Sequence, residues 1–173
     1  MNLEKVMEQL ERTPELIENL CLGLSEEEAH WKPSDNSWSV VEVINHLYDE
    51  EREDFRRRVN LTLNYPGMPW PPITPEEWAV DRSYNKMVFT KSLHAFADER
   101  QKSLEFLKNL EHPDWDKYYD HPQAGKIHAG DLILSWAAHD LLHIRQIAML
   151  RAQLIGKLSE KFNISYASPL TLP

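Results

Sequence analysis

Two histidines one helical turn apart are the strongest sign of chemistry in this sequence. His139 and His143 are four residues apart, so in a helix they project from the same face. Apolar residues at helical spacing flank the pair, including Leu132, Trp136 and Leu150. Burying two imidazoles in such a face costs free energy unless their nitrogens find partners. A divalent metal would satisfy both, although core histidines that bond to protein groups explain many such pairs.

His46, in a different predicted helix, is a candidate third ligand. Glu42 lies one turn before it and Glu50 one turn after it. A salt bridge from His46 to one of these carboxylates is one interpretation, and a metal ligand from a facing helix is the other. Three protein ligands leave a coordination position open, which is typical of catalytic rather than structural metals. Such an ion lowers the pKa of bound water from about 15.7 to about 7, or stabilises a thiolate.

The carboxylates beside His46 are the candidate proton acceptors. Glu50 and Glu42 could each act as a base, and orienting the His46 imidazole is an equal possibility. The chain has one cysteine, Cys21, on the apolar face of the first predicted helix, where a core role is the common one. With no nucleophile evident near the metal, the reacting group would be water or the thiolate of a small cosubstrate. Gln146 could add a hydrogen bond or serve as packing.

The elements that must position these residues are predicted to be helical. Apolar residues recur at helical spacing in four long segments, at about 3–24, 39–63, 83–112 and 131–154. Pro14 predicts a kink or a division of the first segment. Ser39 and Glu42 form the pattern of a capping box at the start of the second. We therefore expect one all-α domain over residues 1–173, a four-helix bundle with up-down type packing.

Three segments between and after these helices lack a helical period. The segment at about 65–78 is predicted to be a loop, because its prolines exclude helix and central strand: Pro69, Pro71, Pro72 and Pro75. This loop could form the rim of a substrate pocket or a lid over the end of the bundle. The segment 111–129 and the tail at about 156–173 are expected to be irregular as well.

Composition limits the partners of the protein. The chain has 173 residues, with 28 acidic and 19 basic side chains and a formal charge of −9. This charge disfavours nucleic acid and anionic membrane surfaces as partners. The sequence contains no run of about 18 uncharged apolar residues and no signal-peptide pattern at its start. We expect a cytoplasmic protein that acts on a small molecule.

Two sequence motifs together carry a resemblance to a known family. The segments Trp38-Ser-Val-Val-Glu-Val-Ile-Asn-His46-Leu47 and His139-x-x-x-His143-Ile-x-Gln146 resemble the DinB/YfiT-like family, and the match in helix order covers nearly the whole chain. The resemblance implies a four-helix bundle, often a homodimer. It also implies a divalent metal, typically zinc or nickel, held by three histidines that correspond to His46, His139 and His143.

The resemblance leaves the reaction open. Relatives include S-transferases that use bacillithiol or mycothiol, a mycothiol-dependent maleylpyruvate isomerase, and proteins named as metal-dependent hydrolases. We therefore expect a metal-dependent transferase or hydrolase that acts on a small electrophile, with a low-molecular-weight thiol as a possible cosubstrate. The alternatives are a non-catalytic bundle that binds a metal or small ligand in a stress response, and a metal-free bundle with core histidines.

Overall fold

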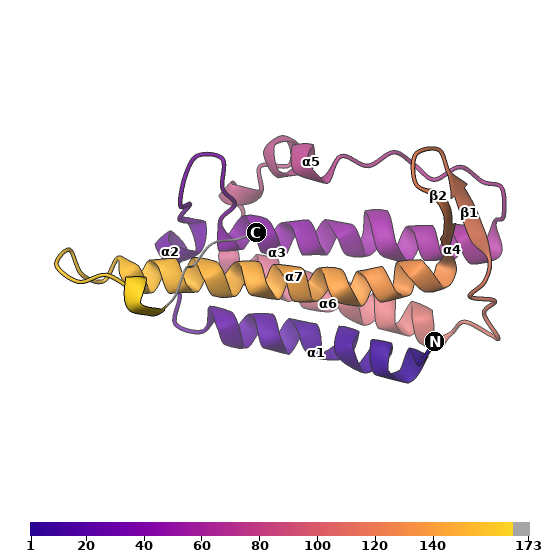
Figure 1. Ribbon diagram of the computed structural model, residues 1–173, viewed down its shortest axis with the longest axis horizontal. Coiled ribbons are helices and arrows are strands. Elements are labelled where there is room, and N and C mark those ends of the chain that lie inside the picture. Colours follow the sequence, from indigo (N-terminus) through magenta and orange to yellow (C-terminus); the bar gives the residue numbers. More distant parts are fainter. Residues whose placement is uncertain (168–173) are drawn as a thin grey trace.

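The computed structural model describes residues 1–167, which form a bundle of four long helical rods (Figure 1). The rods are α1 (Leu3–Cys21), α3 (Val40–Asp49) continued by the π-helix η1 (Glu50–Phe55) and α4 (Arg56–Asn64), α6 (Phe89–Lys108), and α7 (Ala129–Gly156). Shorter elements are α2 (Glu26–His30), α5 (Pro75–Asp81) and the 3₁₀ turns η2 (Tyr84–Lys86) and η3 (Ser165–Ala167). The predicted four-helix bundle is confirmed. The last six residues of the predicted tail lie outside the described residues.

Local sequence signals explain where the rods begin. The Ser39 hydroxyl accepts the backbone N–H of Glu42, and the Glu42 carboxylate accepts the backbone N–H of Ser39 at 2.8 Å. This capping box starts α3 as predicted. Helix α7 begins two residues before Asp131, whose carboxylate accepts the backbone N–H of His128 at 2.8 Å. Asp131 therefore caps the helix from inside its first turn.

The directions of the rods depart from simple up-down alternation. Asn45 bonds to Ser92 and Arg56 bonds to Ser103, so α3–α4 and α6 are parallel neighbours. Helices α1 and α7 are also adjacent and run together in the opposite direction (Figure 1). Residues 65–88 make this order possible, because an extended chain covers more than twice the distance per residue of a helix. This segment returns along the whole bundle before α6 begins.

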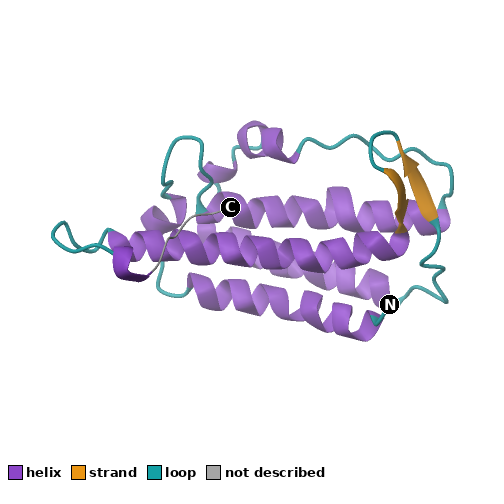
Figure 2. Cartoon of the chain, in the orientation of Figure 1, coloured by secondary structure: helices purple, strands orange, loops and turns teal. Residues whose placement is uncertain are grey.

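Two local features, a hairpin and a short helix, differ from the sequence-based expectations. The segment 111–129 contains an antiparallel hairpin, β1 (Tyr118–His121) and β2 (Gly125–His128), shown in Figure 2. Helix α5 begins at Pro75 within the proline-rich segment, since proline is well suited to the first position of a helix. Helix α1 continues through Pro14. The Leu10 carbonyl, which Pro14 has no N–H to satisfy, accepts a hydrogen bond from the Arg100 guanidinium at 2.8 Å.

The apolar core has two parts along the bundle. One cluster lies toward the hairpin and includes Leu10, Val59 and Ile133. The other lies toward α2 and includes Ile44 and Ile147. Between the two clusters lie buried polar residues of three rods, including Glu51 of η1, Arg100 of α6 and Asp140 of α7. None of the helices described combines the length and the apolar character needed to cross a bilayer.

Cys21 is a core residue of the second cluster, and we predict that it is unreactive in the native protein. Its side chain is 3% exposed, and burial raises its pKa to about 12. Because the thiolate is the reactive form, a disulfide reagent at pH 8 is expected to modify Cys21 at least ~100-fold more slowly in buffer than in concentrated urea. Equal rates in the two solutions, followed by absorbance, would contradict this assignment.

Candidate metal centre

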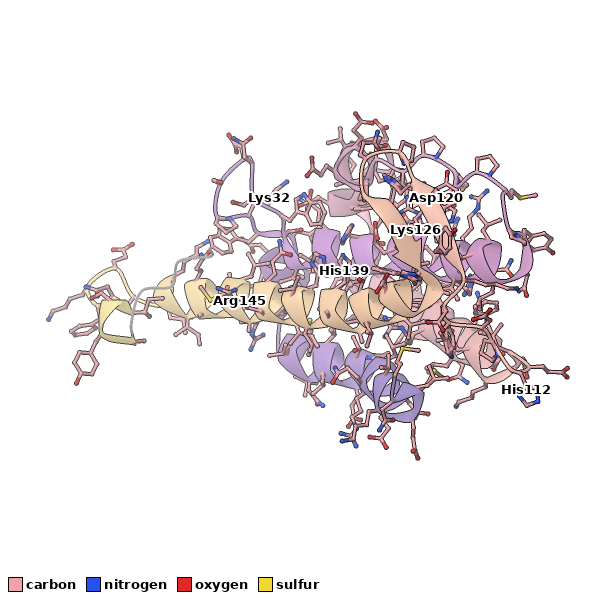
Figure 3. All side chains as sticks on the ribbon, turned by 45° about the vertical axis from the view of Figure 1, so that its right-hand side comes forward. Lys32, His112, Asp120, Lys126, His139 and Arg145 are labelled. Atoms are coloured by element: carbon pink, nitrogen blue, oxygen red, sulfur yellow. The ribbon has the colours of Figure 1, made fainter. Side chains whose placement is uncertain are left out.

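Three imidazole rings meet between α3 and α7. The Nε2 atom of His139 lies 3.3 Å from Nε2 of His46 and 3.1 Å from Nε2 of His143. One ligand atom from each residue lies within 4.8 Å of the others. Figure 3 shows His139 on the side of α7 that faces α3. The structure therefore brings together all three histidines that the sequence suggested as ligands.

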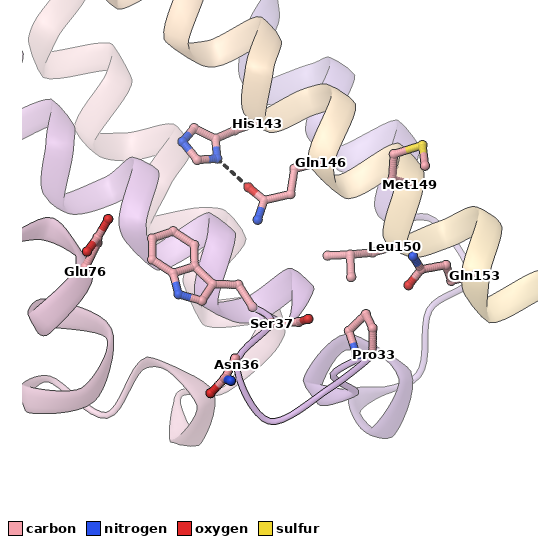
Figure 4. Close-up of a pocket in the computed structure, with 10 residues that line it drawn as sticks. Pro33, Asn36, Ser37, Glu76, His143, Gln146, Met149, Leu150 and Gln153 are labelled. Atoms are coloured by element: carbon pink, nitrogen blue, oxygen red, sulfur yellow. Dashed lines mark hydrogen bonds between the residues drawn. The ribbon is translucent and has the colours of Figure 1, made fainter. Parts of the chain in front are cut away.

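A hydrogen bond fixes which nitrogen of His143 faces the cluster. Nδ1 of His143 lies 2.8 Å from Oε1 of Gln146 (Figure 4). An amide oxygen only accepts, so Nδ1 carries the hydrogen and Nε2 presents a lone pair to the other rings. Of the two roles suggested for Gln146, a hydrogen bond or packing, the structure shows the hydrogen bond.

The environment keeps these rings neutral. His46 is 5% exposed, and burial together with the neighbouring imidazoles lowers its pKa to about 2. Burial and the neighbouring His143 imidazole lower the pKa of His139 to about 3. Burial also lowers the pKa of His143. Neutral imidazole is the form that binds metal ions.

The donor set fits a transition metal such as zinc or nickel. Two nitrogens that each bind a tetrahedral zinc ion at about 2.1 Å are about 3.4 Å apart. The Nε2 separations of 3.1 and 3.3 Å are close to this value. Imidazole is a ligand that zinc, nickel, copper and iron all accept. The cluster can therefore hold a divalent ion with little rearrangement.

Glu50 lies beside His46, as its predicted role as a base or as a partner of the imidazole requires. Its Oε1 is 3.9 Å from Nδ1 of His46, and within residues 1–167 neither atom has a hydrogen-bond partner. Burial, and then repulsion from Asp54, raises the pKa of the Glu50 carboxyl to about 8. A carboxyl with such a pKa carries a proton at neutral pH.

Glu42, the other candidate base, has a different role. One of its carboxylate oxygens accepts the Ser39 backbone N–H at 2.8 Å, and the other accepts Lys32 Nζ at 2.9 Å. Both oxygens are therefore used at the N-terminus of α3, and this capping role competes with the predicted role of Glu42 as a base. The capping pattern with Ser39 was the signal in the sequence that indicated this competing role.

Two aromatic residues near the cluster were not recognised from the sequence as part of the site. The Trp38 ring centroid lies 4.9 Å from that of His46 and 6.4 Å from that of His143. The Phe55 centroid lies 5.3 Å from that of His139. Trp38 belonged to the family motif and Phe55 to an apolar stripe, but neither pattern indicated a contact with histidine.

Two cavities reach the cluster, and Trp38 lines both of them. The larger, of about 610 Å³, is lined by His143, Gln146 and residues of α7 beyond them (Figure 4). The smaller, of about 500 Å³, is lined by His46 and by Ile73, Thr74 and Pro75 of the proline-rich segment. Glu76 of α5 borders both. Among the described residues, those lining the two cavities include no lysine or arginine.

Comparison with known proteins places this geometry in a family. The sequence profile of the DinB superfamily matches residues 9–147, which is most of the chain. The chain belongs to the DinB superfamily. The resemblance seen in the two motifs is thereby confirmed.

Its relatives carry names that refer to metals. A protein of Oceanobacillus iheyensis is 28% identical over 144 residues, which cover 82% of this chain and 81% of the relative; its name is "Putative metal-dependent hydrolase". A Bacillus mycoides protein with the same descriptive name is 23% identical over 88% of this chain and 87% of its own.

A solved structure has the same fold. YfiT from Bacillus subtilis superimposes with a TM-score of 0.77 at 18% sequence identity, covering 87% of this chain and 86% of the YfiT chain. YfiT is described as having an unusual four-helix bundle topology.

Proposed function

We propose that this protein is a metal-dependent enzyme in which His46, His139 and His143 hold a divalent ion, zinc or nickel. The observation that carries the proposal is the convergence of three Nε2 atoms at separations of 3.1 and 3.3 Å, with the lone pair of His143 directed inward. When bound, such an ion supplies Lewis acidity and lowers the pKa of a coordinated water or thiol. Three ligands leave room for a reactant.

The surrounding side chains have separable tasks in this proposal. Gln146 orients His143 through the 2.8 Å hydrogen bond to Nδ1. Glu50 faces Nδ1 of His46 and, with a pKa of about 8, can hold a proton beside the cluster and exchange it during a reaction. Trp38 and Phe55 cover the rings of the cluster and limit access of bulk water.

The cavities support a small electrophilic substrate that is uncharged or cationic. Apolar groups of Trp38, Met149 and Leu150 and amides of Gln146 and Gln153 line the larger cavity. Glu76 is the only charged side chain along it within residues 1–167. A negatively charged substrate would therefore form no ion pair with the cavity wall. A negatively charged substrate atom at the cluster would still be attracted by the metal ion.

Hydrolysis and transfer to a small thiol are the two candidate reactions. The names of the relatives support hydrolysis. The two cavities reach different histidines, His143 and His46, and this supports transfer, because two reactants could approach the cluster together. A low-molecular-weight thiol would supply a thiolate nucleophile, since Cys21, the single cysteine of the sequence, is buried in the second core cluster.

Metal analysis and a product screen test the proposal. Protein purified without chelators is expected to contain about one metal ion per chain, and the His143→Ala variant close to none. The exposed His94 on α6 offers a matched control, and His94→Ala should keep the metal. Incubation with ester and electrophile panels, with and without 2-mercaptoethanol or cysteamine, should give hydrolysed or conjugated product by mass spectrometry only in the metal-loaded protein.

Each part of the proposal can fail separately. Wild-type protein without metal, or a His143→Ala variant that retains it, would contradict the metal site. Stoichiometric metal with no product from either panel would favour a non-catalytic metal-binding bundle.

A further inference from the structure

A buried arginine joins all four rods at the level of the histidine cluster. All five N–H groups of Arg100 are bonded: Nε and Nη2 donate to Glu51 at 2.9 and 2.5 Å, and Nη1 and Nη2 donate to Asp140 at 2.6 and 2.9 Å. Nη1 also donates to the Leu10 carbonyl. The side chains of Arg100, Glu51 and Asp140 are each 1% exposed. We call these groups, together with Trp136, the Arg100 network.

The Arg100 network continues to His139 through two aromatic rings. Nε1 of Trp136 donates to Oε1 of Glu51 at 2.7 Å. The Trp136 ring stacks on Phe55, with centroids 5.5 Å apart and planes inclined by 9°. Phe55 in turn lies against the His139 ring at 5.3 Å. Asp140 is also the residue next to His139, so Arg100 holds the side chain of the residue directly beside this histidine.

The second ring nitrogens of the three histidines have different surroundings. Metal-binding histidines are usually oriented by a hydrogen bond at the second ring nitrogen. Nδ1 of His143 donates this bond to Gln146, whereas Nδ1 of His46 faces the Glu50 carboxyl at 3.9 Å, beyond hydrogen-bond distance. Nδ1 of His139 is buried and makes no hydrogen bond to any described residue. Packing must therefore orient the His139 ring.

We propose that the Arg100 network positions His139 for metal binding, with Trp136 and Phe55 as the positioning residues that transmit its rigidity. The inference rests on the proposed metal site. The π-helix η1 is part of this arrangement, because it contains both Glu51, which binds Arg100, and Phe55, which contacts His139. π-helical segments frequently occur at functional sites.

Two variants interrupt the path at different points. Phe55→Leu removes the ring beside His139 and leaves the ion pairs in place. Trp136→Phe removes the indole N–H that binds Glu51 and keeps an aromatic ring. Phe89→Leu is the matched control, since Phe89 is a buried phenylalanine in the second core cluster, remote from this path. Circular dichroism should show all three variants folded at the temperature of the binding measurements.

The readouts are the Co²⁺ dissociation constant, by competition with a chromophoric chelator, and the visible spectrum of bound Co²⁺. We expect about tenfold weaker binding and an altered spectrum in Phe55→Leu and Trp136→Phe, as for other groups that support metal ligands. Phe89→Leu should lose comparable stability in urea unfolding but bind Co²⁺ within about twofold of wild type. A purely structural role would affect all three variants alike.

The outcomes separate this inference from the proposed function. Wild-type affinity and spectrum in both path variants would overturn the positioning role, provided that wild type binds Co²⁺ and His139→Ala does not. Equal weakening in Phe89→Leu would also overturn it. A wild-type protein that does not bind Co²⁺ would overturn the metal site itself, and this inference with it.

Discussion

Replacing Arg100 with leucine is expected to lower the free energy of unfolding by about 3–5 kcal/mol, the usual cost of removing one partner of a buried ion pair. Glu51 and Asp140 would be left as carboxylates in the core without a cation, and each is 1% exposed. The Leu10 carbonyl would also lose its partner. Urea denaturation of the metal-free protein at pH 7, followed by circular dichroism, measures this loss.

An exposed arginine provides the control for this prediction. Arg12 approaches Glu8 at 4.0 Å, and its side chain is 71% exposed. Arg12→Leu should change the free energy of unfolding by no more than about 0.5 kcal/mol. A variant that also carries Glu51→Gln and Asp140→Asn should recover part of the stability lost in Arg100→Leu, because no uncompensated charge is then buried. A loss below about 1 kcal/mol in Arg100→Leu alone would contradict the role of this network.

Metal loading should stabilise the protein by a similar amount. At a free metal concentration of about 1,000 times the dissociation constant, binding to the native state alone raises the free energy of unfolding by about 4 kcal/mol. The fold brings His46 to His139 across 93 residues of sequence, so the unfolded chain has no comparable site. Urea unfolding with Zn²⁺, compared with unfolding in a chelator, gives the difference.

Two variants define what this stabilisation should depend on. His139→Ala should unfold at the same urea concentration with and without Zn²⁺, because only two of the three proposed ligands remain. His94→Ala should show the full effect, since His94 is exposed on α6. Stabilisation that persists in His139→Ala would mean that the ion binds elsewhere.

Local features of this protein could be read from the sequence because they depend on helix geometry alone. The four-residue spacing of His139 and His143 places both rings on one face wherever the helix packs. The pairing of Ser39 with Glu42 starts α3 through contacts within four residues, and the structure contains it. The four-helix fold followed from apolar spacing along each rod.

The contact between His46 and the two histidines of α7 does not follow from helix geometry. No spacing rule relates residues on different helices, so the residues alone left His46 with two interpretations and the family motif favoured the metal ligand. The packing of α3 on α7 brings the rings together. The role of Glu42 as a base stays a prediction. Its position one turn from His46 was correct, but the cap of α3 competes for the same carboxylate.

The tertiary structure decided the features that join separate rods. The sequence did not distinguish Arg100, Glu51 and Asp140 from solvated charges, because only packing places them on one another. The π-helix changes the register of Phe55 against His139, and apolar periodicity does not encode such a change. The parallel order of α3 and α6 depends on a connection long enough to allow either direction. Sequence thus determined the four long helices and the candidate ligand types, whereas long-range packing determined which helices share a centre and what holds its rings in place.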